Sequence, residues 1–156
     1  MFNVVKVWRA QLTEMTTGLD DSQYPIFLSR AASAQKIYAD LLEKLNEKRN
    51  IEVLMCFRSS ETPVAIAVTQ PKDQKNCAWL WLLCVRPNLI KGEKEFNDRP
   101  RGVGTFVLNY LKETVKSFEL GADMSAVGFY KKNGLRVISS GFSHDRSIFI
   151  QMKWGL

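Results

Sequence analysis

A run of basic and glycine residues that could bind phosphate spans positions 99–104 and reads Arg99-Pro100-Arg101-Gly102-Val103-Gly104. Apolar residues spaced by three and four follow it, so the run predicts a turn that opens a helix. The first N–H groups of a helix lack internal partners and carry partial positive charge, and glycine lets a ligand approach the backbone closely. Arg99 and Arg101 add guanidinium groups that bind phosphate oxygens. This chemistry suits a pyrophosphate, although the run is neither a Walker A loop nor a G-x-G-x-x-G dinucleotide fingerprint. The alternative is a basic glycine-rich loop that binds no ligand, and the six residues taken alone favour that alternative.

The elements that must position this turn lie along one predicted domain, residues 1–156. A nearly unbroken apolar run at Cys77–Val85 precedes the turn and predicts a central strand that is covered on both faces. Pro25 suits the first turn of a helix, and Gly134 suits the left-handed position that ends one. The other expected strands are Phe2–Trp8, Ile51–Arg58, Pro63–Thr69, Glu119–Asp123, Leu135–Gly141 and Ser147–Trp154. The expected helices are Phe27–Leu45, Val103–Phe118 and Ser125–Asn133, with a short helix or loop at Leu12–Ser22. Together they predict an α/β (α+β) domain around a mixed sheet of about six or seven strands.

Composition and charge place the chain among ordinary globular proteins, with 46% hydrophobic and 24% charged residues. The net charge of +6 and the pI near 9.3 favour anionic partners, although a basic surface also serves solubility. Three cysteines (Cys56, Cys77 and Cys84) cannot all pair, and their strand-like flanks predict free, buried thiols in a reducing compartment, hence a cytoplasmic protein. One histidine and no C-x-x-C predict no zinc site. No secretory signal or membrane segment is expected, because no apolar run is long enough.

Two motifs in order give the chain a resemblance to the GNAT acetyltransferase superfamily. The first family signature, [R/Q]-x-x-G-x-[G/A] at the start of a helix, is matched by Arg99, Gly102 and Gly104. Val85-Arg86-Pro87 is similar to the V-x-P that ends the preceding strand in that family. The second signature is roughly N-x-x-A-x-x-x-Y-x-x-x-G-F, and its places are occupied in register by Asp123, Ala126, Tyr130, Gly134 and Leu135.

The resemblance implies a fold, a cosubstrate and a reaction. The expected fold is the GNAT-like mixed, mostly antiparallel sheet flanked by about four helices. Acetyl-CoA would lie in a V-shaped opening between the fourth and fifth strands, and an amine would attack its thioester directly, with no acyl-enzyme and no metal. Tyr130 would act as general acid to the CoA thiolate, which suits a phenol with a pKa near 10. The residues expected to bind the cosubstrate are Leu83, Cys84 and Val85 along the pantetheine arm, and Arg99, Arg101, Gly102, Val103, Gly104 and Thr105 around the pyrophosphate.

Three departures from the family pattern bear on activity. Asp123 stands where the family has asparagine, and Leu135 stands where it has an aromatic residue. The segment Asn88–Asp98 is an insertion between the V-x-P and the first signature. Its few apolar residues predict a segment that buries little surface and is mobile when the site is empty. The segment would be either a lid over the acceptor site, anchored by Phe96, or a plain surface excursion. One of its carboxylates (Glu93, Glu95 or Asp98) could serve as a base.

Other side chains have a structural and a chemical interpretation. His144 falls in an expected hairpin turn, where a solvated residue is favoured over a proton-transfer group. Cys84 is expected to be a buried structural thiol rather than a nucleophile. Trp79 and Trp81 should face the same side of their strand, either as core residues or as a wall of an acceptor pocket.

Three functions stay open from the sequence. The first is an acetyl-CoA-dependent N-acetyltransferase, and the second is an inactive GNAT-like module that binds CoA or a partner. The third is an acetyltransferase for an RNA-borne amine such as aminoacyl-tRNA, which the basic C-terminal part motivates, although a nucleic-acid partner is not favoured. The class of amine acceptor is open, as is the choice between a monomer and a homodimer.

Overall fold

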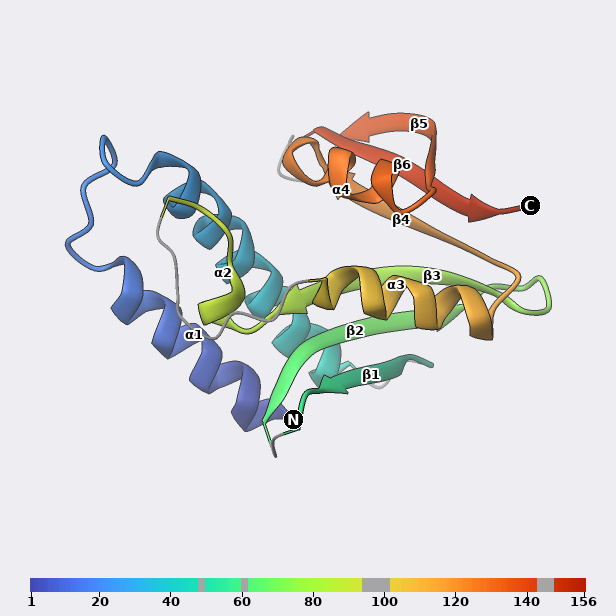
Figure 1. Ribbon diagram of the computed structural model, residues 1–156. Coiled ribbons are helices and arrows are strands. Elements are labelled where there is room, and N and C mark those ends of the chain that lie inside the picture. The colour runs from blue at the N-terminus through green and yellow to red at the C-terminus, as the bar shows by residue number, and fades with distance from the viewer. Residues whose placement is uncertain (48–49, 60–61, 94–101, 143–147) are drawn as a thin grey trace. The chain divides into compact units, whose positions relative to one another are not determined.

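The computed structural model describes residues 1–156 except 48–49, 60–61, 94–101 and 143–147 (Figure 1). Its helices are α1 (Phe2–Thr16), α2 (Pro25–Asn46), α3 (Val103–Thr114) and α4 (Val127–Lys132), with single 3₁₀ turns at Pro87–Leu89 and Met124–Ala126. Its strands are β1 (Glu52–Phe57), β2 (Pro63–Pro71), β3 (Cys77–Val85), β4 (Ser117–Asp123), β5 (Arg136–Phe142) and β6 (Ile148–Gly155). The predicted α/β class is therefore confirmed. No helix in these described ranges has the length and apolar character needed to cross a bilayer.

The strands form one six-stranded sheet in the order β1-β2-β3-β4-β6-β5. β4 pairs with β6, and β6 with β5, in antiparallel fashion, whereas β3 and β4 run parallel. The parallel pairing joins Cys77–Trp79 to Ser117–Glu119. This confirms the expected mixed, mostly antiparallel sheet.

The N-terminal segment corrects one prediction, because Phe2–Trp8 is not a strand. It forms the first half of α1, whose buried residues Val5, Trp8 and Leu12 recur at spacings of three and four. Three valines between positions 4 and 7 favour a strand locally. The helical period becomes visible only when the window is extended to Leu12, and burial of that face then outweighs the local preference.

The described chain divides into two compact units, each of which is treated by itself. The first comprises Met1–Arg49, Leu54–Ala67 and Leu82–Gly104. Here α1 packs on α2, with the rings of Trp8 and Tyr38 5.7 Å apart, and Pro25 opens α2 as expected. Their buried side chains and those of β2 make the core of this unit.

The second unit comprises Asn50–Val53, Val68–Trp81 and Thr105–Leu156. Its core holds Phe118 and Leu120 of β4 together with Met152 of β6, and the ring of Phe118 stacks on Trp154 at 5.7 Å. Gly134 ends α4 with φ of 84°, the left-handed conformation that the sequence predicts there. Phe118 lies inside β4, so the expected end of the preceding helix at that residue is wrong.

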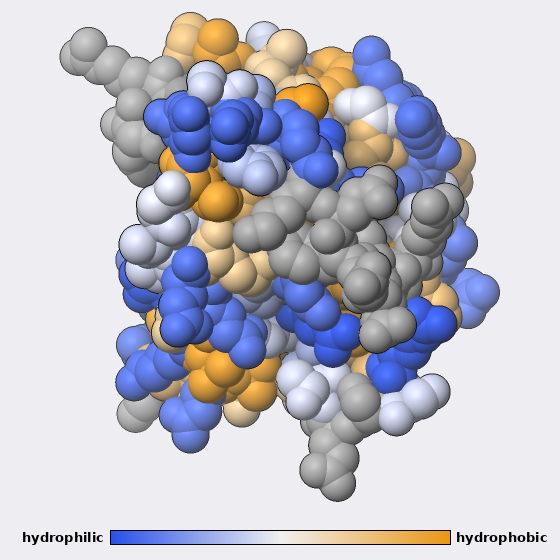
Figure 2. Space-filling view, turned by 60° about the vertical axis from the view of Figure 1, so that its left-hand side comes forward, coloured by the Kyte–Doolittle hydropathy of each residue, from blue (hydrophilic) through white to orange (hydrophobic). Residues whose placement is uncertain are grey.

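Burial shows that β2, not β3, is the strand covered on both faces. Seven consecutive residues of β2, Pro63–Thr69, are buried, whereas β3 buries Ala78, Leu80 and Cys84 and leaves the alternate residues partly exposed. The prediction of two covered faces for β3 is therefore wrong. On the face shown in Figure 2, apolar side chains form separate small patches among hydrophilic ones.

Candidate functional site

At the end of β3, the main-chain groups of successive residues point to opposite edges of the strand. The N–H of Arg86 donates to the carbonyl of Val64 on β2 at 3.1 Å. Main-chain groups alternate along a strand, so Cys84 also faces β2, and Leu83 and Val85 face the opposite edge. The Val85 carbonyl accepts a hydrogen bond from the hydroxyl of Tyr38. Of the three residues predicted along the pantetheine arm, Cys84 faces β2 and the carbonyl of Val85 is bonded to Tyr38. Leu83 is therefore the residue whose main-chain groups face away from β2 and make no bond to Tyr38.

The Cys84 thiol has a structural environment. It is buried and lies 3.6 Å from the carbonyl of Ile66, to which it donates. Burial raises the pKa of Cys84 to about 12, and the hydrogen bond to Ile66 offsets only part of that rise. A thiol that stays protonated at neutral pH is a poor nucleophile, in agreement with the structural role expected from the sequence. Cys56 and Cys77 are also free, but both are only half-buried.

The described part of the glycine turn before α3 consists of Gly102 and the start of the helix. Gly102 has φ of 76°, in the left-handed region, and a Cβ built on it would meet no atom of the described residues within 4 Å. Val103 is the first residue of α3, so the N–H groups of Val103, Gly104 and Thr105 belong to its first turn. Arg99 and Arg101 lie outside the described residues. The helix start thus directs backbone N–H donors along its axis, which is the chemistry that a pyrophosphate requires, and its binding there remains a prediction.

Tyr130 lies on α4 in the second unit, and its side chain is half-buried against the ring of Phe129, with the ring centroids 5.1 Å apart. Burial raises the pKa of Tyr130 to about 12, and the charge of Asp123 acts in the same direction. The phenol therefore remains protonated across the neutral range and can donate its proton to a stronger base.

The two departures in the second signature have different structural consequences. Leu135 is 4% exposed and follows Gly134 with its N–H bonded to the carbonyl of Tyr130, so it fills a core position that an aromatic residue would otherwise occupy. Asp123 is exposed at the end of β4 and acts on Tyr130 through its charge. Leucine at position 135 therefore changes the packing of the core, and aspartate at position 123 raises the pKa of Tyr130, the predicted acid.

The described part of the insertion, Asn88–Glu93, is packed against α2. Leu89 and Ile90 are buried, and a Cβ on Gly92 would lie 2.6 Å from the Cβ of Phe27. The expectation of a segment with little buried surface is therefore wrong for these residues. Residues 94–98, with Glu95, Phe96 and Asp98, lie outside the described residues, as does His144, so the lid remains a prediction.

Glu93, which lies far from α2 in the sequence, caps the N-terminus of that helix. Its carboxylate accepts from the backbone N–H groups of Ile26 and Phe27, both at 2.9 Å. Burial alone would raise the pKa of Glu93, but these two hydrogen bonds and the nearby Arg30 bring it below its ordinary value. A carboxylate held in this way serves the helix N-terminus and is a weak base.

Trp79 and Trp81 share one face of β3, as the period of two predicts, with their rings 5.7 Å apart. Trp81 is 39% exposed, and its Nε1 donates to Oε1 of Gln70 at 2.8 Å. Both tryptophans therefore lie on the less buried face of the strand. The core-packing interpretation is wrong for the exposed Trp81, whereas Trp79 is partly buried. Their role as a pocket wall remains a prediction.

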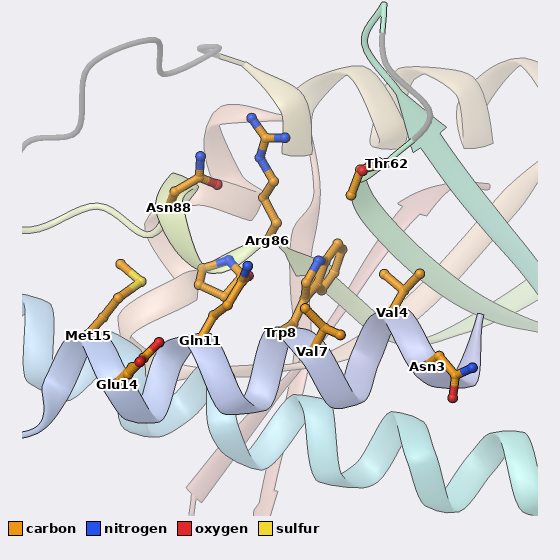
Figure 3. Close-up of a pocket in the computed structure, with 11 residues that line it drawn as sticks. Asn3, Val4, Val7, Trp8, Gln11, Glu14, Met15, Thr62, Arg86 and Asn88 are labelled. Carbon is orange, nitrogen blue, oxygen red and sulfur yellow. The ribbon is translucent and has the colours of Figure 1, made fainter.

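A cavity of about 690 Å³ lies in the first unit, between one face of α1 and the segment that follows β3 (Figure 3). Arg86 and Asn88 contribute its polar groups on the side opposite α1. The sequence analysis did not assign either residue to a site. A signal was available for Arg86, because a basic residue stands directly after the strand predicted to hold the cosubstrate.

Comparisons with known proteins give structural but not sequence matches. No family model and no curated protein matches the sequence. The PaiA N-acetyltransferase of Thermoplasma acidophilum, solved with coenzyme A, aligns over 99% of this chain and 92% of its own, with 17% identity and a TM-score of 0.55. An aminoglycoside 6'-N-acetyltransferase complexed with coenzyme A aligns over 83% and 85%, with 15% identity and a TM-score of 0.55. GCN5 of Tetrahymena aligns over 81% and 82%, with 15% identity and a TM-score of 0.51. The element order, the mixed sheet and these alignments over most of the chain agree, and the protein has the GNAT acetyltransferase fold.

Proposed function

We propose that the protein is an N-acetyltransferase that moves an acetyl group from acetyl-CoA directly to an amine. The observation that carries the proposal is the glycine turn at the start of α3, with Gly102 in the left-handed region, in a chain with the GNAT fold. Two of the solved structures with this fold contain coenzyme A.

The proposed binding roles combine the resemblance with the geometry of the described residues. The backbone N–H groups at Gly102–Thr105 bind the pyrophosphate, and Arg99 and Arg101 add their charge. Leu83 supplies main-chain hydrogen bonds to the pantetheine arm, because its groups lie on the edge of β3 away from β2. Acetyl-CoA supplies the activated acetyl group as a thioester.

Tyr130 holds the proton that the reaction has to deliver. The attacking amine forms the new C–N bond and loses a proton, and the C–S bond breaks to leave a thiolate. A phenol with a pKa of about 12 is fully protonated at neutral pH, so Tyr130 can hydrogen-bond to the sulfur or protonate it as the bond breaks. The Cys84 thiol takes no covalent part, because burial keeps it protonated.

The test is acetyl-CoA turnover on a panel of amines, with free thiol and acetylated product measured together. The panel contains small amines, amino acids, peptides and aminoacyl-tRNA. Thiol release that depends on one class of amine, with its acetylated product found by mass spectrometry, supports the proposal. If CoA binds but no amine is acetylated, the chain is an inactive CoA-binding module. A dependence on aminoacyl-tRNA that weakens with salt would identify the RNA-borne acceptor.

A further inference from the structure

The cavity in the first unit is lined by both apolar and polar side chains. Val4, Val7 and Trp8 of α1 and Pro87 supply apolar surface, and Arg86 and Asn88 supply polar groups opposite α1 (Figure 3). The remaining α1 residues of the lining are mostly polar, namely Asn3, Gln11 and Glu14, with Met15. Its volume of about 690 Å³ lies in the range of small-molecule sites, roughly 300–1,000 Å³. Leu83 and Gly102–Thr105, the described residues proposed above to bind CoA, do not line it.

Two polar atoms at this cavity are buried and have no hydrogen-bond partner in the described part of the chain. They are Nε of Arg86, which is a donor, and Oδ1 of Asn88, which is an acceptor. A buried polar atom without a partner costs roughly 1–3 kcal/mol, and such atoms are few in native proteins. A ligand that accepts from Arg86 and donates to Asn88 would remove both costs.

The backbone holds these two side chains in place. The N–H of Arg86 donates to Val64 on β2, and its carbonyl accepts from the N–H of Leu89 at 3.0 Å. Pro87 begins the 3₁₀ turn between them, and the N–H of Ile90 closes it on the Pro87 carbonyl. Arg86 and Asn88 are thus only two residues apart on a rigid turn, so a ligand can meet both with neighbouring groups.

We infer that this cavity binds a free α-amino acid with an apolar side chain, whose carboxylate meets Arg86 and whose amino group meets Asn88. A carboxylate is the natural partner of a guanidinium, and the amino group on the next carbon supplies the donor that Oδ1 lacks. Val4, Val7 and Trp8 favour an apolar side chain over a charged one. The carboxylate of Glu14, which also lines the cavity and has no ion-pair partner in the described residues, favours an ammonium group over a hydroxyl.

This inference rests on the proposed function for one further step, that the bound amino acid is the acetyl acceptor. An α-amino acid carries the amine that the proposed reaction needs. The substrate class would then be free apolar amino acids, and the product an N-acetylamino acid with a C–N bond in place of the thioester bond. Binding to the cavity and acetylation can be measured separately.

Calorimetry on the full chain without acetyl-CoA tests the binding. The probes are phenylalanine, phenethylamine, which lacks the carboxylate, and 3-phenylpropionate, which lacks the amine. Phenylalanine is expected to bind, and each of the other two to bind more weakly. Equal binding of all three, or no binding of phenylalanine, leucine or methionine, would overturn the inference.

Variants locate the binding. Arg86→Gln should weaken phenylalanine binding roughly 10- to 100-fold, the loss expected for a charge-assisted hydrogen bond. Arg86→Lys, which keeps the charge but not the guanidinium, should bind phenylalanine more tightly than Arg86→Gln and more weakly than the wild type. The matched control Arg9→Gln removes the same charge from an exposed position of α1 that does not line the cavity, and should leave binding unchanged. Equal effects of Arg86→Gln and Arg9→Gln would overturn the assignment of the site.

Acetylation of phenylalanine is followed in the same preparations by thiol release. Turnover that falls with binding in Arg86→Gln supports the cavity as the acceptor site. Binding that is lost in Arg86→Gln, with no acetylation of phenylalanine by the wild-type protein, supports the cavity and overturns the acceptor role. Acetylation of other amines without any binding of amino acids supports the proposed function and overturns the cavity.

Discussion

The hydroxyl of Tyr38, on α2, donates a hydrogen bond to the main-chain carbonyl of Val85, the last residue of β3. Tyr38 is completely buried, and burial, together with Cys84, raises the pKa of Tyr38 above its ordinary value, so it remains a donor. The bond ties the helix to the strand end immediately before Arg86. One contact therefore fixes the strand predicted to hold the cosubstrate and the turn that carries the cavity residues.

Tyr38→Phe removes this donor while keeping the ring that packs on Trp8. The free energy of unfolding should fall by roughly 0.5–1.5 kcal/mol, the net contribution of one such hydrogen bond. Urea unfolding measures the change, with Tyr110→Phe as the control, because Tyr110 is exposed on α3. A Tyr38→Phe protein as stable as the wild type would show that the bond adds nothing to the fold.

Much of the fold could be predicted because the local pattern and the tertiary environment agree. The strand at Cys77–Val85 has the bounds that the sequence predicts, and Gly134 ends its helix as expected. The strand predicted at Phe2–Trp8 is wrong, because the valines there favour a strand locally whereas burial against α2 stabilises a helix.

The candidate site could be predicted only in part, for a related reason. The glycine turn before α3 is a local motif, so the sequence shows it. The cap that Glu93 forms on α2 joins residues 66 and 67 positions apart, and the cavity needs α1 beside the segment after β3. Such pairings depend on the whole fold, so no local pattern of types and spacings indicated them.

Tyr130→Phe should lower kcat roughly 10²- to 10⁴-fold, the usual range for a general acid, with acetyl-CoA affinity little changed. The ring is retained, so its contact with Phe129 persists and only the proton donor is lost. Steady-state kinetics and calorimetry separate the two effects. Turnover at the wild-type rate would show that Tyr130 is a packing residue.

Asp123→Asn should lower the pKa of Tyr130 from about 12, because it removes a negative charge that disfavours the phenolate. Burial should still keep the pKa above the ordinary value near 10. An NMR titration of ring-labelled tyrosine measures the shift, with Tyr130→Phe to assign the signal. An unchanged or higher pKa would contradict the electrostatic role given to Asp123.

Glu93→Gln should lower the melting temperature at neutral pH, because it weakens the cap on Ile26 and Phe27. The pKa of Glu93 is lowered in the folded protein, so its contribution is present above the ordinary carboxyl pKa and is lost as the pH falls through the folded-state pKa. The difference from wild type should therefore shrink on acidification. Glu43→Gln, an exposed change on the same helix, should show no such pH dependence.

Calorimetric titration of CoA into the wild-type and Gly104→Val proteins tests most directly whether the turn before α3 holds the cosubstrate. A valine side chain in the first turn of α3 should block the approach of the pyrophosphate to the backbone N–H groups. Circular dichroism checks that the fold is retained, and Ala10→Val, at an exposed position of α1, controls for the added side chain. The account predicts that wild type and Ala10→Val bind CoA and that Gly104→Val does not. Absence of binding to the wild type, or equal binding to Gly104→Val, would contradict it.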